Sequence, residues 1–315
     1  MQDKFSRRDF IQKAAQIGAV AALGITGCGR KGSNETALPT GRMPRAAGSN
    51  PMLAIASDRT PEKMTRAAVD ALGGMKTFVK PGDFVVVKPN IAWSRRPEMA
   101  ATTNPEVVSA VVKMCREAGA KRVVVLDHII DKPYELVMAI TGIKPAAETA
   151  GAEVVSAGEE SMYRKIKILK GKSLSSEDVV KEVLDADVFI NLPIAKCHGD
   201  IRVTLGMKNL MGVIWNRQAW HISMSVHQCI ADFATAVRPD LTILDANRIL
   251  LENGPKGPGK TKDVRQVIAG TDVVAVDAYG ATLFDLKPSD IKHILMAHEH
   301  GLGEIDLSKV KIEKV

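Results

Sequence analysis

The chain has 315 residues, of which 45% are hydrophobic and 25% are charged, the composition of an ordinary globular protein. Its formal charge of +7 suits an anionic ligand or a membrane surface. Aromatic residues make up only 4% and are not interleaved with a basic stripe, so no nucleic-acid-binding surface is expected.

The first 27 residues have the layout of an export signal. Arg7 and Arg8 precede Phe10 and an apolar run over residues 14–27, as in twin-arginine signal peptides. This run is shorter than the about 20 residues of a membrane-spanning helix. Residues 25–28 fit a bacterial lipobox, so we expect the twin-arginine translocation machinery to export the chain and lipid on Cys28 to anchor it at the periplasmic or extracytoplasmic face of a membrane. Ordinary cleavage with an unmodified Cys28 is the alternative.

Residues 28–50 are rich in Gly, Ser, Pro and Arg and have no apolar periodicity, which predicts a flexible tether. From residue 51 to 315, short β-branched runs alternate with amphipathic segments, which predicts one α/β domain with a doubly wound, mostly parallel sheet and helices on both faces. The expected strands are 52–57, 83–88, 122–127, 152–156, 187–192, 241–245, 264–269 and 310–314.

Local sequence patterns predict where several helices begin and end. Thr60 and Asn104 each precede a proline, the pattern of an N-cap followed by the first helical residue, and Gly119 is placed to end the second of these helices. Ser175 and Asp178 have the spacing of a capping box, which predicts a helix to about Asp185.

Polar residues gather where the expected strands end, and ligands of open α/β sheets bind at that edge. Each of these residues alone would be an ordinary turn or capping residue, but together they predict a site. We expect one cavity lined by Lys88, Asp127, Lys196, His198, Lys208 and Asp245.

Several motifs resemble the domain of unknown function 362 family across nearly the whole chain after the tether. They are VVVKPN (85–90), ATTNP (101–105), LD (126–127), NLPIAKCHGDIRVTLGMKNLMGVIW (191–215), LDA (244–246), NGPKGPG (253–259) and TDVVAVDAYG (271–280). Some members are known as iron–sulfur proteins because they also carry ferredoxin-type cysteine clusters. Here Cys115, Cys197 and Cys229 are widely spaced, so no iron–sulfur cluster is implied.

The residues of these motifs suggest three roles. Candidate catalytic groups are Lys196, His198 and Lys208, because neighbouring buried lysines lower one another's pKa and a neutral imidazole can shuttle a proton. Candidates for binding a small anionic substrate are Lys88, Asn90, Asn209, Gly254 and Gly257. Candidate ligands of a divalent or transition metal are Asp127, His198, Asp245 and Asp277. For Asp277, helix capping with a salt bridge is an equal alternative.

Residues 254–261 match the phosphate-binding pattern GxxxxGK[ST], but Pro255 and Pro258 remove two of the backbone N–H groups such a loop needs, and a strand is expected to follow. We therefore expect this Gly-Pro loop to close over the cavity instead.

Two classes of function remain open. The first is an exported enzyme for a small anionic substrate, with metal-assisted or redox-linked chemistry included. The second is a noncatalytic lipoprotein that binds a ligand or assists a membrane redox partner.

Overall fold

The computed structural model describes residues 38–45, 52–222 and 224–315. The predicted export signal and Cys28 lie outside these residues. In the part that is described, no helix combines the length and apolar character needed to cross a bilayer.

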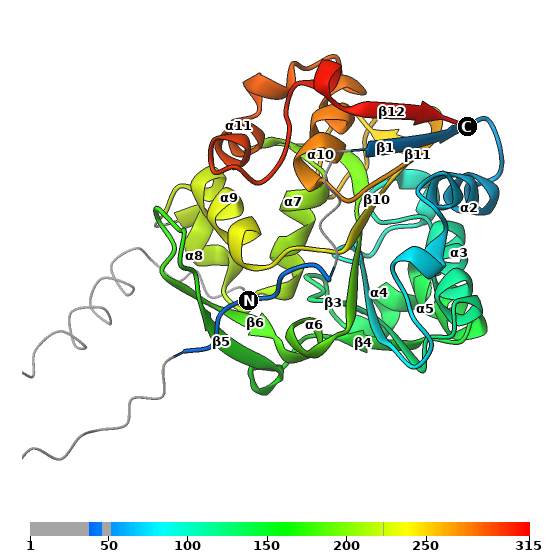
Figure 1. Ribbon diagram of the computed structural model, residues 1–315, viewed down its shortest axis with the longest axis horizontal. Coiled ribbons are helices and arrows are strands. Elements are labelled where there is room, and N and C mark those ends of the chain that lie inside the picture. Colours follow the sequence, from blue (N-terminus) through cyan, green and yellow to red (C-terminus); the bar gives the residue numbers. More distant parts are fainter. Residues whose placement is uncertain (1–37, 46–51, 223) are drawn as a thin grey trace, which may run out of the picture. The chain divides into compact units, whose positions relative to one another are not determined.

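A central mixed sheet organises the described chain (Figure 1). Its main path runs in the order β12-β1-β11-β10-β7-β2-β3-β4, and β8 extends it by pairing with β10 and β9. All neighbours on the main path are parallel except those of β11, which is antiparallel to β1 and β10. The strands of the main path are β1 (Met52–Ser57), β2 (Phe84–Pro89), β3 (Arg122–Asp127), β4 (Glu153–Ser156), β7 (Val188–Leu192), β10 (Leu241–Leu250), β11 (Thr261–Gly270) and β12 (Lys311–Lys314).

Helices cover both faces of this sheet, which confirms the predicted fold class (Figure 1). One face carries α2 (Pro61–Ala71), α3 (Pro105–Glu117), α4 (Tyr134–Ile140) and α5 (Ile143–Thr149). The other carries α7 (Gly206–Asn209), α9 (Val226–Ala236), α10 (Val273–Thr282) and α11 (Lys292–Glu299). Two further α-helices of the described residues are short, α6 (Lys181–Asp185) and α8 (Arg217–Ile222).

The strands divide their side chains between two cores because successive residues of a strand point to opposite faces. In β1, Leu53 and Ile55 pack with the α9 and α10 face, whereas Ala54 and Ala56 pack with the α2 and α3 face. The predicted caps are also present: Thr60 and Asn104 accept backbone N–H groups at the starts of α2 and α3.

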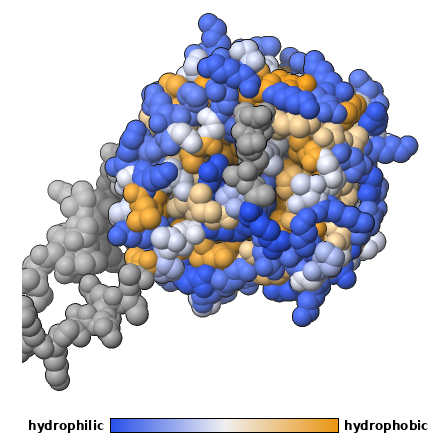
Figure 2. Space-filling model, in the orientation of Figure 1, coloured by the Kyte–Doolittle hydropathy of each residue, from blue (hydrophilic) through white to orange (hydrophobic). Residues whose placement is uncertain are grey.

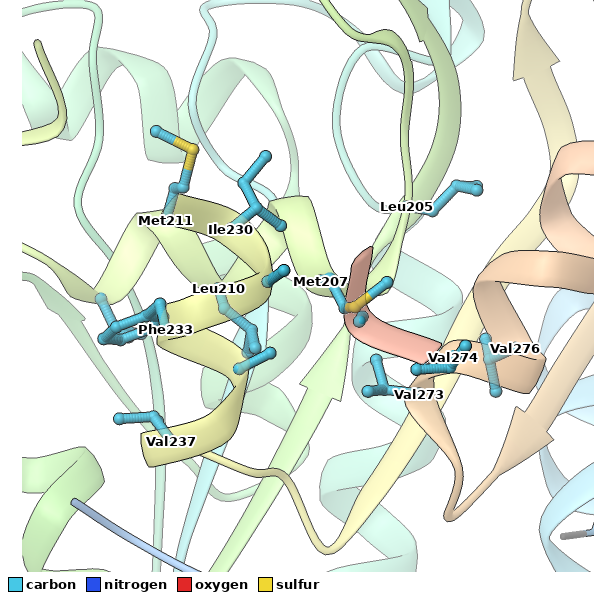
Figure 3. Close-up of a cluster of buried hydrophobic side chains, with 14 of the residues drawn as sticks. Leu205, Met207, Leu210, Met211, Ile230, Phe233, Val237, Val273, Val274 and Val276 are labelled. Carbon is cyan, nitrogen blue, oxygen red and sulfur yellow. The ribbon is translucent and has the colours of Figure 1, made fainter. Parts of the chain in front are cut away.

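One of these cores fixes α7, which matters for the site. Met207 and Leu210 pack with Ile230 and Phe233 of α9 and with Val273 of α10 (Figure 3). Lys208 and Asn209 lie between these two anchored residues. Their backbone positions are therefore set by a buried apolar cluster.

The helix expected from Ser175 to Asp185 is wrong. Ser176–Val180 forms strand β6, which pairs antiparallel with β5 (Tyr163–Lys167), and only Lys181–Asp185 is helical. Val179 and Val180 are fully buried, so burial of β-branched side chains outweighed the capping-box pattern.

A second difference from the predicted elements concerns the segment that contains the candidate residues Lys196 and His198. Residues 194–198 were not among the expected strands, but Ile194–His198 forms β8, which makes a hairpin with β9 (Arg202–Thr204). Side chains two apart on a strand share a face. Lys196 and His198 therefore line the same cavity, whereas Cys197 lines a separate hollow.

The tether was predicted to run to residue 50, yet residues 38–45 pack against the domain. Arg42 is buried, forms an ion pair with Asp240 and donates a hydrogen bond to the carbonyl of Arg238. Arg45 forms an ion pair with Asp83 at 2.7 Å. Because buried and paired charges hold this segment, the folded unit begins at Leu38 rather than at residue 51.

Over the face shown in Figure 2, hydrophobic side chains form separate patches among hydrophilic ones.

Candidate functional site

A cavity of about 470 Å³ lies beside β2, β8 and α7. Five of the six residues expected to share a cavity line it: Lys88, Asp127, Lys196, His198 and Lys208. Asn90 and Asn209, which were predicted to bind substrate, line it as well.

Lys88 is held by an ion pair and two hydrogen bonds. Its Nζ lies 2.8 Å from Asp127 Oδ1, and it donates to the carbonyl of Pro89 at 2.7 Å and to Asn209 Oδ1 at 3.1 Å. Burial lowers the pKa of Lys88, and the Asp127 carboxylate opposes that shift. Lys88 is therefore fixed in place beside a carboxylate.

Lys196 has a different environment. Its Nζ donates to Asn90 Oδ1 at 3.1 Å and to the carbonyl of Ala101 at 2.5 Å. These two bonds account for both N–H groups of a neutral amine and leave its lone pair able to accept a proton. Burial, reinforced by the charge of Lys208, lowers the pKa of Lys196 to about 7. Lys196 therefore has the properties of a general base.

An amide network fixes the position of Lys196. Asn90 Nδ2 donates to Asn209 Oδ1 at 3.1 Å, and Asn209 Nδ2 donates to Asn191 Oδ1 at 2.9 Å. Asn191 Nδ2 in turn donates to the carbonyl of Gly206 at 2.9 Å. The two lysines and α7 are therefore joined through one buried set of hydrogen bonds.

Lys208 and Arg217 supply cationic charge that the protein leaves partly unmatched. Within the described residues, the Lys208 ammonium group makes no hydrogen bond or ion pair, and the only hydrogen bond of the Arg217 guanidinium goes to the carbonyl of His128, at 2.8 Å. Burial and the nearby Arg217 lower the pKa of Lys208 to about 8, so it is mostly protonated at neutral pH. An anion in the cavity would find two donors available.

His198 is held as a single neutral tautomer. Its Nδ1 accepts the backbone N–H of Asp200 at 3.2 Å, so the ring proton of the neutral imidazole resides on Nε2. The ring stacks on His221 with centroids 6.3 Å apart. Burial, with the charge of Lys208, lowers the pKa of His198 to about 3.

We therefore expect His198 to stay neutral, with its proton on Nε2, from pH 8 down to about pH 4. Long-range ¹H–¹⁵N spectra of histidine-labelled protein would report both the tautomer and the titration. In Lys208→Met the His198 midpoint should rise, because a repelling charge is removed. A midpoint near the usual histidine value in the unmodified protein would contradict this geometry.

Asp245 does not join the cavity, which corrects the expectation. Its carboxylate accepts the backbone N–H of Asn104 at 2.8 Å and that of Asn247 at 3.0 Å, and it faces a separate hollow beside the start of α3. Burial raises the pKa of Asp245 to about 6. Its side chain ties β10 to α3.

Asp277 is likewise placed away from the cavity. From α10 it accepts the backbone N–H groups of Gly206 at 2.5 Å and Met207 at 2.9 Å, the first residues of α7. Asp277 therefore caps a helix, which was the alternative to metal binding, but the helix is a neighbouring one and not its own. The four predicted metal ligands are therefore not brought together, and no group of three or more metal-binding side chains occurs among the residues that the structure describes.

The Gly-Pro loop does approach the cavity. Pro255 lines it, and Gly254 donates its N–H to Cys197 Sγ at 3.2 Å. Gly257 has a φ of 62°, a conformation that suits glycine. Gly254 and Gly257 thus shape the loop, but neither lines the cavity. β11 begins directly at Thr261, so no helix follows the phosphate-loop pattern.

Several lining residues were not predicted from the sequence. They are chiefly Trp93, Ile130, Arg217, His221 and Ile222. His221 and Arg217 lie on α8, four residues apart and so on one helix face. That spacing next to the long motif at 191–215 was the one available signal.

Residues 85–282 match the family described as "Domain of unknown function (DUF362)". The chain belongs to this family. A curated relative is the thylakoid-associated protein sll1697 of Synechocystis, which is 32% identical over 256 residues that cover 76% of this chain and 74% of the relative.

Two solved structures are distantly similar to this DUF362 protein. The lactate racemase apoprotein from Thermoanaerobacterium thermosaccharolyticum has a TM-score of 0.47 and 12% identity, covering 78% of this chain and 61% of that one. A protein from Thermotoga maritima has a TM-score of 0.42 and 11% identity, covering 76% and 59% of the two chains. The chain thus spans about three fifths of each of these structures.

Proposed function

We propose that this protein is an exported enzyme that transfers a proton to or from a small organic anion in the cavity, with Lys196 as the base. The observation that carries the proposal is the contrast between two buried lysines. Among the residues that the structure describes, Lys88 donates two hydrogen bonds and pairs with the Asp127 carboxylate, whereas Lys196 donates two hydrogen bonds and has no ion pair. A buried amine with a free lone pair and a pKa of about 7 is suited to proton transfer at neutral pH.

The other lining residues support a substrate with a negative charge. Lys208 and Arg217 would bind its carboxylate or phosphate group. When Lys196 takes a proton from the carbon next to that group, the negative charge that develops on the substrate is stabilised by the same two cations. Lys196, now an ammonium ion, returns the proton or exchanges it with solvent.

This chemistry can be tested before the natural substrate is known. A panel of small carboxylates and phosphate esters is incubated with the protein in D₂O, and carbon-bound hydrogen is followed by NMR. We expect protein-dependent exchange of deuterium into at least one anion. Anions that bind and never exchange would overturn the enzymatic proposal and favour the noncatalytic ligand-binding lipoprotein.

We also propose that the chain is exported by the twin-arginine route and anchored through lipid on Cys28, a proposal supported by residues 6–28 and by the thylakoid association of a 32% identical relative. Replacing Arg7 and Arg8 by Lys should leave an uncleaved precursor in the cytoplasm. Cys28→Ser should release the protein from the membrane fraction. Fractionation and mass spectrometry of the N-terminal peptide would measure both, and membrane retention of Cys28→Ser would count against the lipid anchor.

A further inference from the structure

The cavity has charged residues at its buried end and apolar side chains among its exposed lining residues. Lys88 and Lys196 are each only 1% exposed. The exposed lining residues include two isoleucines, Ile130 at 44% and Ile222 at 76%, beside the polar residues Asp200, Gln218 and His221. The mouth therefore offers apolar as well as polar surface to a ligand.

Exposed large hydrophobic side chains, such as those of the two isoleucines, are few in the described chain. Seven large hydrophobic residues are exposed there, and two of them border this one cavity. Ile130 follows β3 and Ile222 ends α8, so two separate segments each contribute one. The cavity wall also includes the apolar residues Trp93, Met211 and Pro255. A hydrophilic ligand would leave this wall facing water, at a cost proportional to its apolar area.

We propose that the ligand of this cavity is an amphiphilic organic anion: a carboxylate or phosphate attached to an apolar chain or ring of several carbons. The charged group lies inward near Lys196, Lys208 and Arg217, and the apolar body extends along Trp93 toward Ile130 and Ile222. This inference rests on the anion site of the proposed function and specifies its substrate class.

The apolar wall predicts how affinity depends on chain length. Burying one methylene group strengthens binding about three- to fourfold. In a series of straight-chain carboxylates from acetate to octanoate, affinity should therefore rise stepwise until the chain passes Ile222. A matching series of alkyl phosphates should behave in the same way.

Isothermal titration calorimetry can measure both series, with every ligand used as a dissolved monomer. The full-length Cys28→Ser chain avoids the need for detergent, which would compete for an apolar wall. The test variants are Ile130→Ser and Ile222→Ser. The matched control is Leu169→Ser, because Leu169 is 67% exposed and does not line the cavity.

We expect both isoleucine variants to flatten the chain-length series while acetate binding is unchanged, and Leu169→Ser to behave like the parent. Equal affinity for acetate and octanoate, or an equal loss in Leu169→Ser, would overturn the inference. Weakening of acetate binding in Lys208→Met would show that the anion site itself remains valid in that case. If no anion binds at all, the proposed function fails too.

Vesicles that contain phosphatidic acid separate two sources of the same chemistry. Vesicle binding that octanoate displaces and that Ile222→Ser abolishes would identify a bilayer lipid as the ligand. Binding of the dissolved anions alone would identify a soluble one.

Discussion

Replacing Gly212 by Ala is expected to lower the free energy of unfolding by about 3–5 kcal/mol, the cost of breaking a buried ion pair. A Cβ at this position would overlap Asp127 Oδ1 and the Cε and Nζ atoms of Lys88. The backbone cannot easily move away, because the Gly212 carbonyl accepts the N–H of His128 at 3.0 Å. The two side chains, which are only 1% and 2% exposed, must therefore separate without full hydration of their charges.

Urea unfolding followed by circular dichroism would measure this loss. Gly199→Ala is the matched control, because a Cβ there meets nothing within 4 Å and its stability should change little. If Gly212→Ala were as stable as Gly199→Ala, the close approach of Gly212 to the Lys88–Asp127 pair would be wrong.

Replacing Lys196 by Met is expected to reduce deuterium exchange into a responsive anion by about 10²- to 10⁴-fold, the usual contribution of a general base. The rate in the parent protein should rise through a pH near 7, where Lys196 loses its proton. Lys113→Met is the control, because Lys113 is a partly exposed surface lysine paired with Glu62 and should leave the rate unchanged.

Lys196→Met should also change how the free energy of unfolding depends on pH. Since burial lowers the pKa of Lys196 in the folded state to about 7, the unfolded state binds more protons above that pH, and stability rises as pH rises. Between pH 7.5 and 8.5 this contribution is about 1 kcal/mol per pH unit. It should disappear in Lys196→Met and remain in Lys113→Met. An unchanged slope would show that Lys196 is not a depressed-pKa amine.

Much of this architecture could be predicted from the sequence because it depends on local patterns. Strands β1 and β3 have the predicted bounds, and the polar residues after β2 and β3 meet at one edge of the sheet, as parallel strands require. The strand containing Lys196 was missed, since the Lys196 ammonium or amine group is satisfied by partners about a hundred residues away. The residues next to Lys196 in the sequence do not indicate such distant partners.

Asp245 and Asp277 show a second limit. Both are buried acids in motifs that suggested a metal, yet each accepts two backbone N–H groups: Asp277 from the distant segment at the start of α7, and Asp245 from distant Asn104 and nearby Asn247. A carboxylate that binds a cation and one that binds main-chain donors look the same in a sequence. Only the fold distinguishes them.

The hydrogen bonds of Asp277 to α7 also determine when the cavity can form during synthesis of the chain. The cavity's lysines lie between residues 88 and 208, but the first turn of α7 is tied to a residue 71 positions beyond Gly206. A growing chain therefore exposes the N-terminus long before this site can assemble, and α10 must leave the ribosome first. Export of a fully folded protein, which the twin-arginine route provides, would deliver the cavity already complete.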